Sequence, residues 1–109
     1  MELEVFIGDL EDDLFDYENG DYNGNIPKRI SMFFPKSHST FHFILQKIED
    51  KEIEGKQTDW GAWVALLYLH EMKDLLKGFY NEADFKVVEK EMIKLDANKK
   101  YALVACEMI

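Results

Sequence analysis

The first ten residues alternate between apolar and polar side chains, which is the pattern of a strand with one buried face. Leu3, Val5 and Ile7 share one side of this run. A period of two predicts a strand that ends near Gly8 and Asp9. We expect this strand to lie inside a sheet or next to its edge.

A second alternating run covers residues 29–34 and ends at Pro35. Ile30, Met32 and Phe34 fall on the same side of it, so we expect a strand with these three side chains on one face. Proline cannot donate a backbone hydrogen bond to a ladder, so it is a suitable end for the strand.

After Pro35 the spacing of apolar residues changes from that of a strand to that of a helix. Four apolar residues form one stripe, namely Phe41, Ile44, Leu45 and Ile48. This i, i+3, i+4, i+7 spacing predicts an amphipathic helix over residues 40–51. Ser37 or Ser39 is the expected N-cap.

A second helix is predicted over Trp60–Lys77, after a polar link from Gly55 to Thr58. Thr58 or Asp59 is expected to cap its start, and Gly78 is well placed to end it. Its first half is apolar nearly all round, which is typical of a helix buried on most sides. We therefore expect it to be the central helix of the fold.

Residues 85–95 fit two patterns. A helix would bury Phe85, Val88, Met92 and Leu95, whereas a strand would bury Phe85, Val87, Ile93 and Leu95. The strand is favoured, because residues 101–109 alternate and a turn over residues 96–100 would join the two as a hairpin.

Together these elements predict an α+β fold with the order β-β-α-α-β-β. We expect a mostly antiparallel sheet of about four strands, with two helices packed on one face. The chain of 109 residues is interpreted as one domain, 1–109, with an acidic loop rich in Tyr and Asn-Gly at about 9–27. The expected core contains Val5, Ile7, Phe41, Ile44, Leu45, Trp60, Val64, Leu67, Leu103 and Ala105.

The negative charge of the chain is confined to its first quarter. Residues 1–27 carry nine of the 22 acidic residues and no Lys or Arg, and the remaining 13 acids equal the 13 basic residues of the rest. The net charge of -9 therefore belongs to this stretch. It argues against nucleic acid or an anionic membrane as a direct partner.

Other features indicate a cytoplasmic protein. The single cysteine, Cys106, excludes an internal disulfide and fits a reducing compartment. The acidic N-terminus has no positive region of a secretory signal, and the longest apolar run, Gly61 to Leu69, is short for a membrane span.

Metal chemistry is weakly indicated at three places. His70 and Asp74 stand four residues apart with Glu71 between them, which resembles a degenerate zincin helix but lacks a third ligand. His38 and His42 have the same spacing near a predicted helix start. A loop starting at Asp16 departs from the EF-hand pattern, so no dedicated calcium site is expected, and neither is a cofactor.

The remaining candidates have ordinary structural explanations. Cys106 has Glu107 beside it and no cation nearby in sequence, so a buried structural thiol is expected. Trp60 and Trp63 are expected to pack in the core rather than to stack on a ligand. The only basic doublets are Lys28-Arg29 and Lys99-Lys100, which do not form a stripe for nucleic acid.

The leading hypothesis is a non-enzymatic inhibitor that binds a basic protein partner, such as a toxin nuclease, through an acidic-aromatic surface. In general type the chain resembles bacterial immunity proteins, and also phage-encoded DNA mimics. Such inhibitors are small, acidic α+β proteins without catalytic motifs. The expected contact residues are Asp12, Asp13, Asp16, Tyr17, Glu18, Asp21 and Tyr22.

Two alternatives remain. One is an enzyme or small-ligand binder with a pocket beside the central helix, lined by His70, Glu71, Trp60 or Trp63. The other is a structural or adaptor subunit of an assembly, with an apolar surface covered by its neighbours. A third reading of the acidic stretch is a solvated loop that contributes only solubility.

Overall fold

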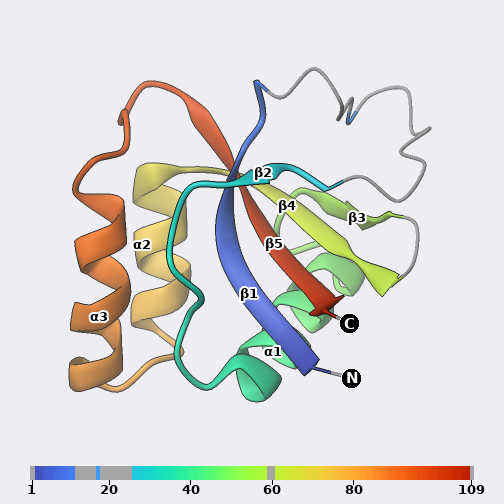
Figure 1. Cartoon of the computed structure of the whole chain (residues 1–109), viewed down its shortest axis with the longest axis horizontal. Coiled ribbons are helices and arrows are strands. Elements are labelled where there is room, and N and C mark those ends of the chain that lie inside the picture. The colour runs from blue at the N-terminus through green and yellow to red at the C-terminus, as the bar shows by residue number, and fades with distance from the viewer. Residues whose placement is uncertain (1, 12–16, 18–25, 59–60, 109) are drawn as a thin grey trace.

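The computed structural model describes residues 2–11, 17, 26–58 and 61–108. These residues contain five strands and three helices, in the order β1 (Glu2–Asp9), β2 (Lys28–Arg29), α1 (Ser37–Glu49), β3 (Gly55–Gln57), β4 (Trp63–Tyr68), α2 (Leu69–Lys77), α3 (Glu82–Met92) and β5 (Lys100–Met108). The α+β class is confirmed, with one more strand and one more helix than expected (Figure 1).

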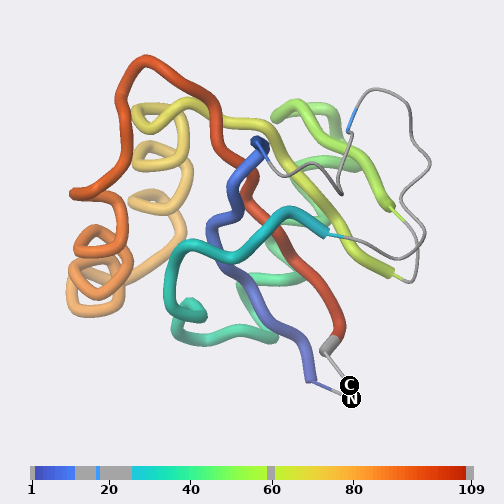
Figure 2. The backbone as a smooth tube through the Cα atoms, turned by 45° about the horizontal axis from the view of Figure 1, so that its top comes forward, coloured from blue at the N-terminus to red at the C-terminus, as the bar shows by residue number. Residues whose placement is uncertain are grey.

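The five strands form one sheet in the order β2-β1-β5-β4-β3, and every neighbouring pair is antiparallel. The strand β1 is second from one edge, as predicted. The last strand, β5, lies at the centre, where it pairs along its length with β1 and β4. The start of β1 therefore lies beside the end of β5, as Figure 2 shows.

The three helices lie on one face of the sheet, which was also expected. The helix α1 packs against β1, β5, β4 and β3, while α2 packs against β4 and β5, and α3 packs on α2 (Figure 1). The core between them is fully buried at Val5, Ile7, Ile44, Met72, Leu76, Met92, Leu103 and Ala105. Burial of this much apolar surface is the main source of stability of the fold.

The opposite face of the sheet carries a second buried cluster. It consists of Phe6, Ala62, Val64, Leu66, Ala102, Val104 and Cys106. Leu10, Tyr17 and Ile26 pack against it from the acidic stretch. We refer to this cluster as the outer cluster. The sheet is thus buried on both faces, which the sequence did not lead us to expect.

The prediction of one helix over Trp60–Lys77 was wrong. Residues Trp63–Tyr68 form β4, paired residue by residue with β5, and only Leu69–Lys77 are helical, followed by Gly78 as expected. A strand buried on both faces is apolar at every position, so it has the same pattern as a helix buried on most sides. Trp60 lies outside the described residues.

The strand prediction for residues 85–95 was also wrong, and the helical alternative was correct. Asn81 caps α3 by accepting the Asp84 N–H at 2.8 Å. Val88 and Met92, four residues apart, are buried, whereas Ile93 from the strand pattern is 78 % exposed. The expected hairpin is therefore absent among residues 82–108, and β5 pairs with β1 and β4 instead.

Residues 29–34 follow the edge of β1 without forming a regular strand beyond Arg29. Backbone hydrogen bonds join Ile30 N to Ile7 O at 2.9 Å and Phe34 N to Val5 O at 2.8 Å. Between them the Ser31 hydroxyl accepts the Ile7 N–H at 2.8 Å. Because a side chain takes the place of a backbone acceptor, the ladder is interrupted and Met32 is exposed rather than on a shared face.

Two smaller differences concern α1 and β3. The helix α1 begins at Ser37, and its N-cap is Lys36, with φ 52° and ψ 50°, rather than Ser37 or Ser39. The predicted stripe holds, because Phe41, Ile44 and Ile48 are buried. The expected polar link after Gly55 contains the short edge strand β3, whose backbone pairs with β4.

Candidate functional site

The acidic stretch is held to the fold through three apolar side chains. Leu10, Tyr17 and Ile26 are partly buried and pack against the outer cluster. They lie near the beginning, middle and end of the stretch, which leaves β1 at Asp9 and returns at β2. Each of these three side chains is held by the fold, so each would lose less conformational entropy on binding than a free side chain does.

Lys99 binds the beginning of the stretch. Its ammonium lies 3.3 Å from a Glu11 carboxylate oxygen and 3.9 Å from Asp9 Oδ1. Asp9 Oδ1 also accepts the Glu11 N–H at 3.0 Å, which fixes the turn. Partial desolvation lowers the pKa of Lys99, but the hydrogen bond to Glu11 and the two carboxylate charges outweigh it, so the net shift of the pKa is upward.

Lys56 of β3 lies over the ring of Tyr17. Its Nζ is 4.1 Å from the centre of the Tyr17 ring, within the range of a cation–π interaction. The ring also packs on the outer cluster and is half-buried. Tyr17 therefore has a structural role in addition to any contact with a partner.

Tyr17 is the one predicted contact residue that the structure describes. The other six, Asp12, Asp13, Asp16, Glu18, Asp21 and Tyr22, lie outside the described residues. Their role in binding stays a prediction. Lys56 and Lys99 were missed by sequence reasoning, since nothing in the sequence relates a lysine to a residue that is distant in the chain.

The residues of the zincin-like pattern have other partners in α2. Glu71 accepts the Tyr68 N–H at 3.0 Å and so satisfies the start of the helix. The His70 ring stacks on Tyr68, with 6.0 Å between the ring centroids, and Asp74 is exposed. In the parts of the chain that are described, no group of three or more His, Cys, Asp or Glu is gathered closely enough to hold a metal ion.

Cys106 is buried in the outer cluster, as expected for a structural thiol. Burial raises the pKa of its thiol to about 11, and the charge of Glu4 on the neighbouring strand adds to the shift. A thiol with so high a pKa is a poor nucleophile.

The alternative hypothesis of a pocket beside a central helix assumed a helix over Trp60–Lys77, of which residues 63–68 are a strand. Trp63 lies in β4 and is partly buried against the helix-side core. The expectation that it packs in the core is confirmed, and Trp60 lies outside the described residues.

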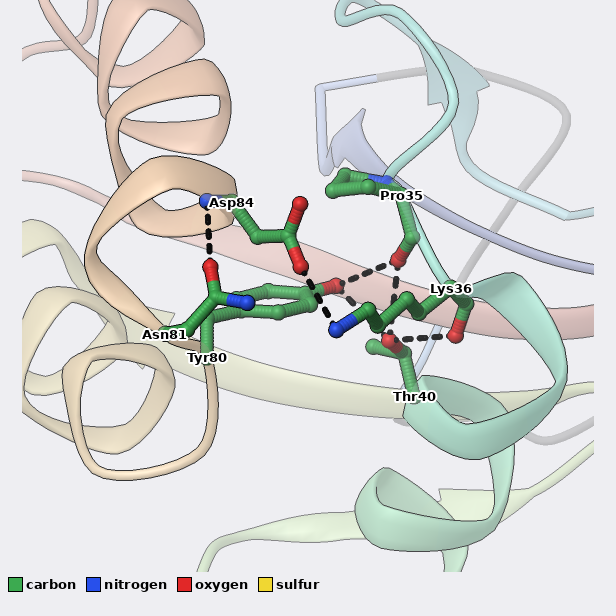
Figure 3. A network of polar contacts seen from close by, with 6 residues as sticks. All are labelled: Pro35, Lys36, Thr40, Tyr80, Asn81 and Asp84. Carbon is green, nitrogen blue, oxygen red and sulfur yellow. Dashed lines mark hydrogen bonds and ion pairs between the residues drawn. The ribbon is translucent and has the colours of Figure 1, made fainter.

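A polar network joins α1 to α3 on the helix side of the sheet (Figure 3). The hydroxyl oxygens of Thr40 and Tyr80 lie 2.7 Å apart, and either hydroxyl can donate to the other. The hydroxyl that accepts donates its own proton to a backbone carbonyl, that of Lys36, 2.8 Å from Thr40 Oγ1, or that of Pro35, 3.1 Å from the Tyr80 oxygen. Lys36 Nζ lies 3.0 Å from Asp84 Oδ2. Burial is the main reason why the pKa of Tyr80 is raised to about 12, so Tyr80 is neutral here and its network is structural.

None of the helices in the described part of the chain has the length and apolar character needed to cross a membrane.

Comparisons of the chain with protein-family models, with curated proteins and with solved structures gave no match.

Proposed function

We propose that the protein is a non-enzymatic inhibitor that binds a basic protein partner through its acidic stretch. The proposed contacts are Asp12, Asp13, Asp16, Tyr17, Glu18, Asp21 and Tyr22. Binding would mask the cationic surface of the partner and thereby prevent its activity.

The observation that carries this proposal is the separation of charge along the chain. Nine acidic residues and no basic residue lie in positions 1–27, and the rest of the chain is neutral. A surface of one sign attracts a partner of the other sign, speeds encounter and repels wrong partners. Solubility requires a net charge, but it does not require that the charge be concentrated in one quarter of the sequence.

Contacts of the described residues support a role for Tyr17. Lys99 binds Asp9 and Glu11, and Leu10 and Tyr17 pack on the outer cluster. A side chain that the fold already holds, such as Tyr17, costs less entropy to order on binding.

A toxin nuclease is the partner class that fits best. The active site of a nuclease is cationic because it must bind phosphate groups, so a cluster of carboxylates is complementary to it. Such an inhibitor acts in the cytoplasm beside its toxin and needs neither cofactor nor catalytic residue. The resemblance of general type to bacterial immunity proteins agrees with this partner class.

The experiment compares the protein with a variant that has lost four charges of the stretch. The charge variant carries Asp12→Asn, Asp13→Asn, Asp16→Asn and Glu18→Gln. A matched control removes four exposed acids from the neutral remainder, namely Glu49→Gln, Asp50→Asn, Asp74→Asn and Glu82→Gln. Each is immobilised and exposed to a native lysate at low salt, and the captured protein is identified and assayed for nuclease activity.

We expect the wild type to capture a basic protein. The nuclease activity of that protein should fall when the wild-type inhibitor is added. Association of the charge variant should be slower by at least about tenfold at low salt, with a weaker salt dependence, because exposed charges act over a Debye length of about 8 Å. The matched control should associate at nearly the wild-type rate. Equal slowing of both variants, or a captured protein that remains fully active, would contradict the proposal.

A further inference from the structure

Two histidine rings lie close together on α1. His38 and His42 stand four residues apart, and both are exposed. Their ring centroids are 4.7 Å apart, with 58° between the ring planes. Zinc–nitrogen bonds of about 2.0–2.1 Å place the ring centroids of two imidazoles on one tetrahedral ion roughly 5 Å apart. The two rings are therefore already at the separation that a shared ion requires.

The turn of α1 that carries His38 is tied by hydrogen bonds of Thr40. Thr40, which lies between them, bonds to the Lys36 carbonyl through both its hydroxyl and its N–H, at 2.8 and 2.9 Å. The hydroxyl of Tyr80 holds Thr40 from the other side (Figure 3). The His42 ring packs edge-to-face on buried Phe41, with 5.4 Å between their centroids. A metal site on a rigid element binds with little reorganisation.

The charges near the pair permit a cation. The nearest basic side chain in the sequence, Lys36, is directed to Asp84 at 3.0 Å. The partial positive charge of the α1 N-terminus opposes a cation, so moderate rather than tight binding is expected.

We propose that His38 and His42 form a binding site for a divalent transition-metal ion such as Zn²⁺ or Ni²⁺. Imidazole nitrogen is a preferred ligand of these ions, whereas Mg²⁺ prefers oxygen. The described residues supply only these two ligands, since no group of three or more candidate ligands is gathered there. Water fills the remaining positions, and the fold does not depend on the ion.

The remaining histidine, His70, provides a matched control. It is exposed on α2 and stacks on Tyr68, and the residue four positions later is Asp74 rather than a second histidine. Titration calorimetry with ZnCl₂, NiCl₂ and MgCl₂ should compare the 109-residue wild type with His38→Ala, His42→Ala, His42→Gln, His70→Ala and the four-charge variant of the acidic stretch. Circular dichroism checks that each variant is folded.

The proposal expects one Zn²⁺ or Ni²⁺ site in the wild type, at least about tenfold weaker binding in each variant of the pair, and unchanged binding in His70→Ala. Mg²⁺ should compete poorly. Wild-type affinity in His38→Ala or in both His42 variants would overturn the proposal. The proposal would also be overturned if the four-charge variant of the acidic stretch lost metal binding while the histidine variants kept it. The ion would then be bound by carboxylates.

Discussion

The hydroxyl groups of Thr40 and Tyr80 lie 2.7 Å apart, which joins the first turn of α1 to the loop between α2 and α3. Thr40 is fully buried and Tyr80 is nearly so. Because buried hydroxyls must be hydrogen-bonded, this contact fixes where the two helical segments meet. It also gives the protein a titratable group whose protonation depends on folding.

The first prediction concerns stability at alkaline pH. The pKa of Tyr80 is raised from 10.0 to about 12 in the folded state, chiefly by burial. Between these values the unfolded chain has lost the Tyr80 proton while the folded protein keeps it, so the free energy of unfolding falls as pH rises through this window. Urea unfolding should show this decline in the wild type, and a smaller decline in Tyr80→Phe.

Absorbance titration supplies the independent check. One tyrosine of the wild type should ionise late, near pH 12, and this late phase should disappear in Tyr80→Phe. At neutral pH the variant should lose about 0.5–1.5 kcal/mol, the usual contribution of one hydrogen bond. A wild type whose tyrosines all titrate near pH 10 would contradict this account.

The second prediction tests whether the sheet is covered on both faces. Leu66 and Leu67 are neighbours in β4 that point to opposite faces, and they are 9 % and 2 % exposed. Replacing either by Ala should reduce the free energy of unfolding by about 2–5 kcal/mol, because each leaves a cavity. Val87→Ala, at an exposed position of α3, should change it by less than about 0.5 kcal/mol. If Leu66→Ala behaved like Val87→Ala in urea unfolding, the outer face would be open.

The third prediction concerns Cys106. Its thiol is buried and has a pKa of about 11, so at pH 8 both access and thiolate content are low. Reaction with an aromatic disulfide reagent at about pH 8 should be slower by roughly two orders of magnitude in the folded protein than in urea. Rapid labelling without denaturant would mean that the outer cluster opens easily.

The fourth prediction separates packing from binding at Tyr17. Because its ring packs on the outer cluster and lies under Lys56, Tyr17→Ala should destabilise the fold by about 1–2 kcal/mol. Tyr17→Phe keeps the ring and should retain most of that stability. Thermal melts of the two variants provide the measurement. Equal melting temperatures for Tyr17→Ala and wild type would show that the ring does not hold the stretch.

The sequence by itself located β1, α1 and β5. Alternation predicted strands at β1 and β5, and the i, i+3, i+4, i+7 stripe predicted α1. That both strands are also buried on their second face came only from the structure. The sequence also determined the confinement of charge to residues 1–27, which needs no structure to be seen. The α+β class and the placing of helices on one face follow from these elements.

Only the tertiary structure decided whether residues 63–68 and residues 82–92 form a strand or a helix. Residues 63–68 are apolar throughout because β4 is covered on both faces, by helices on one and by the outer cluster with Leu10, Tyr17 and Ile26 on the other. Residues 82–92 became a helix because packing on α2 buries Val88 and Met92 together. A local pattern records that a side chain is buried, but not what covers it. The pairing of Lys99 with Glu11 and the approach of His38 to His42 likewise required the folded chain.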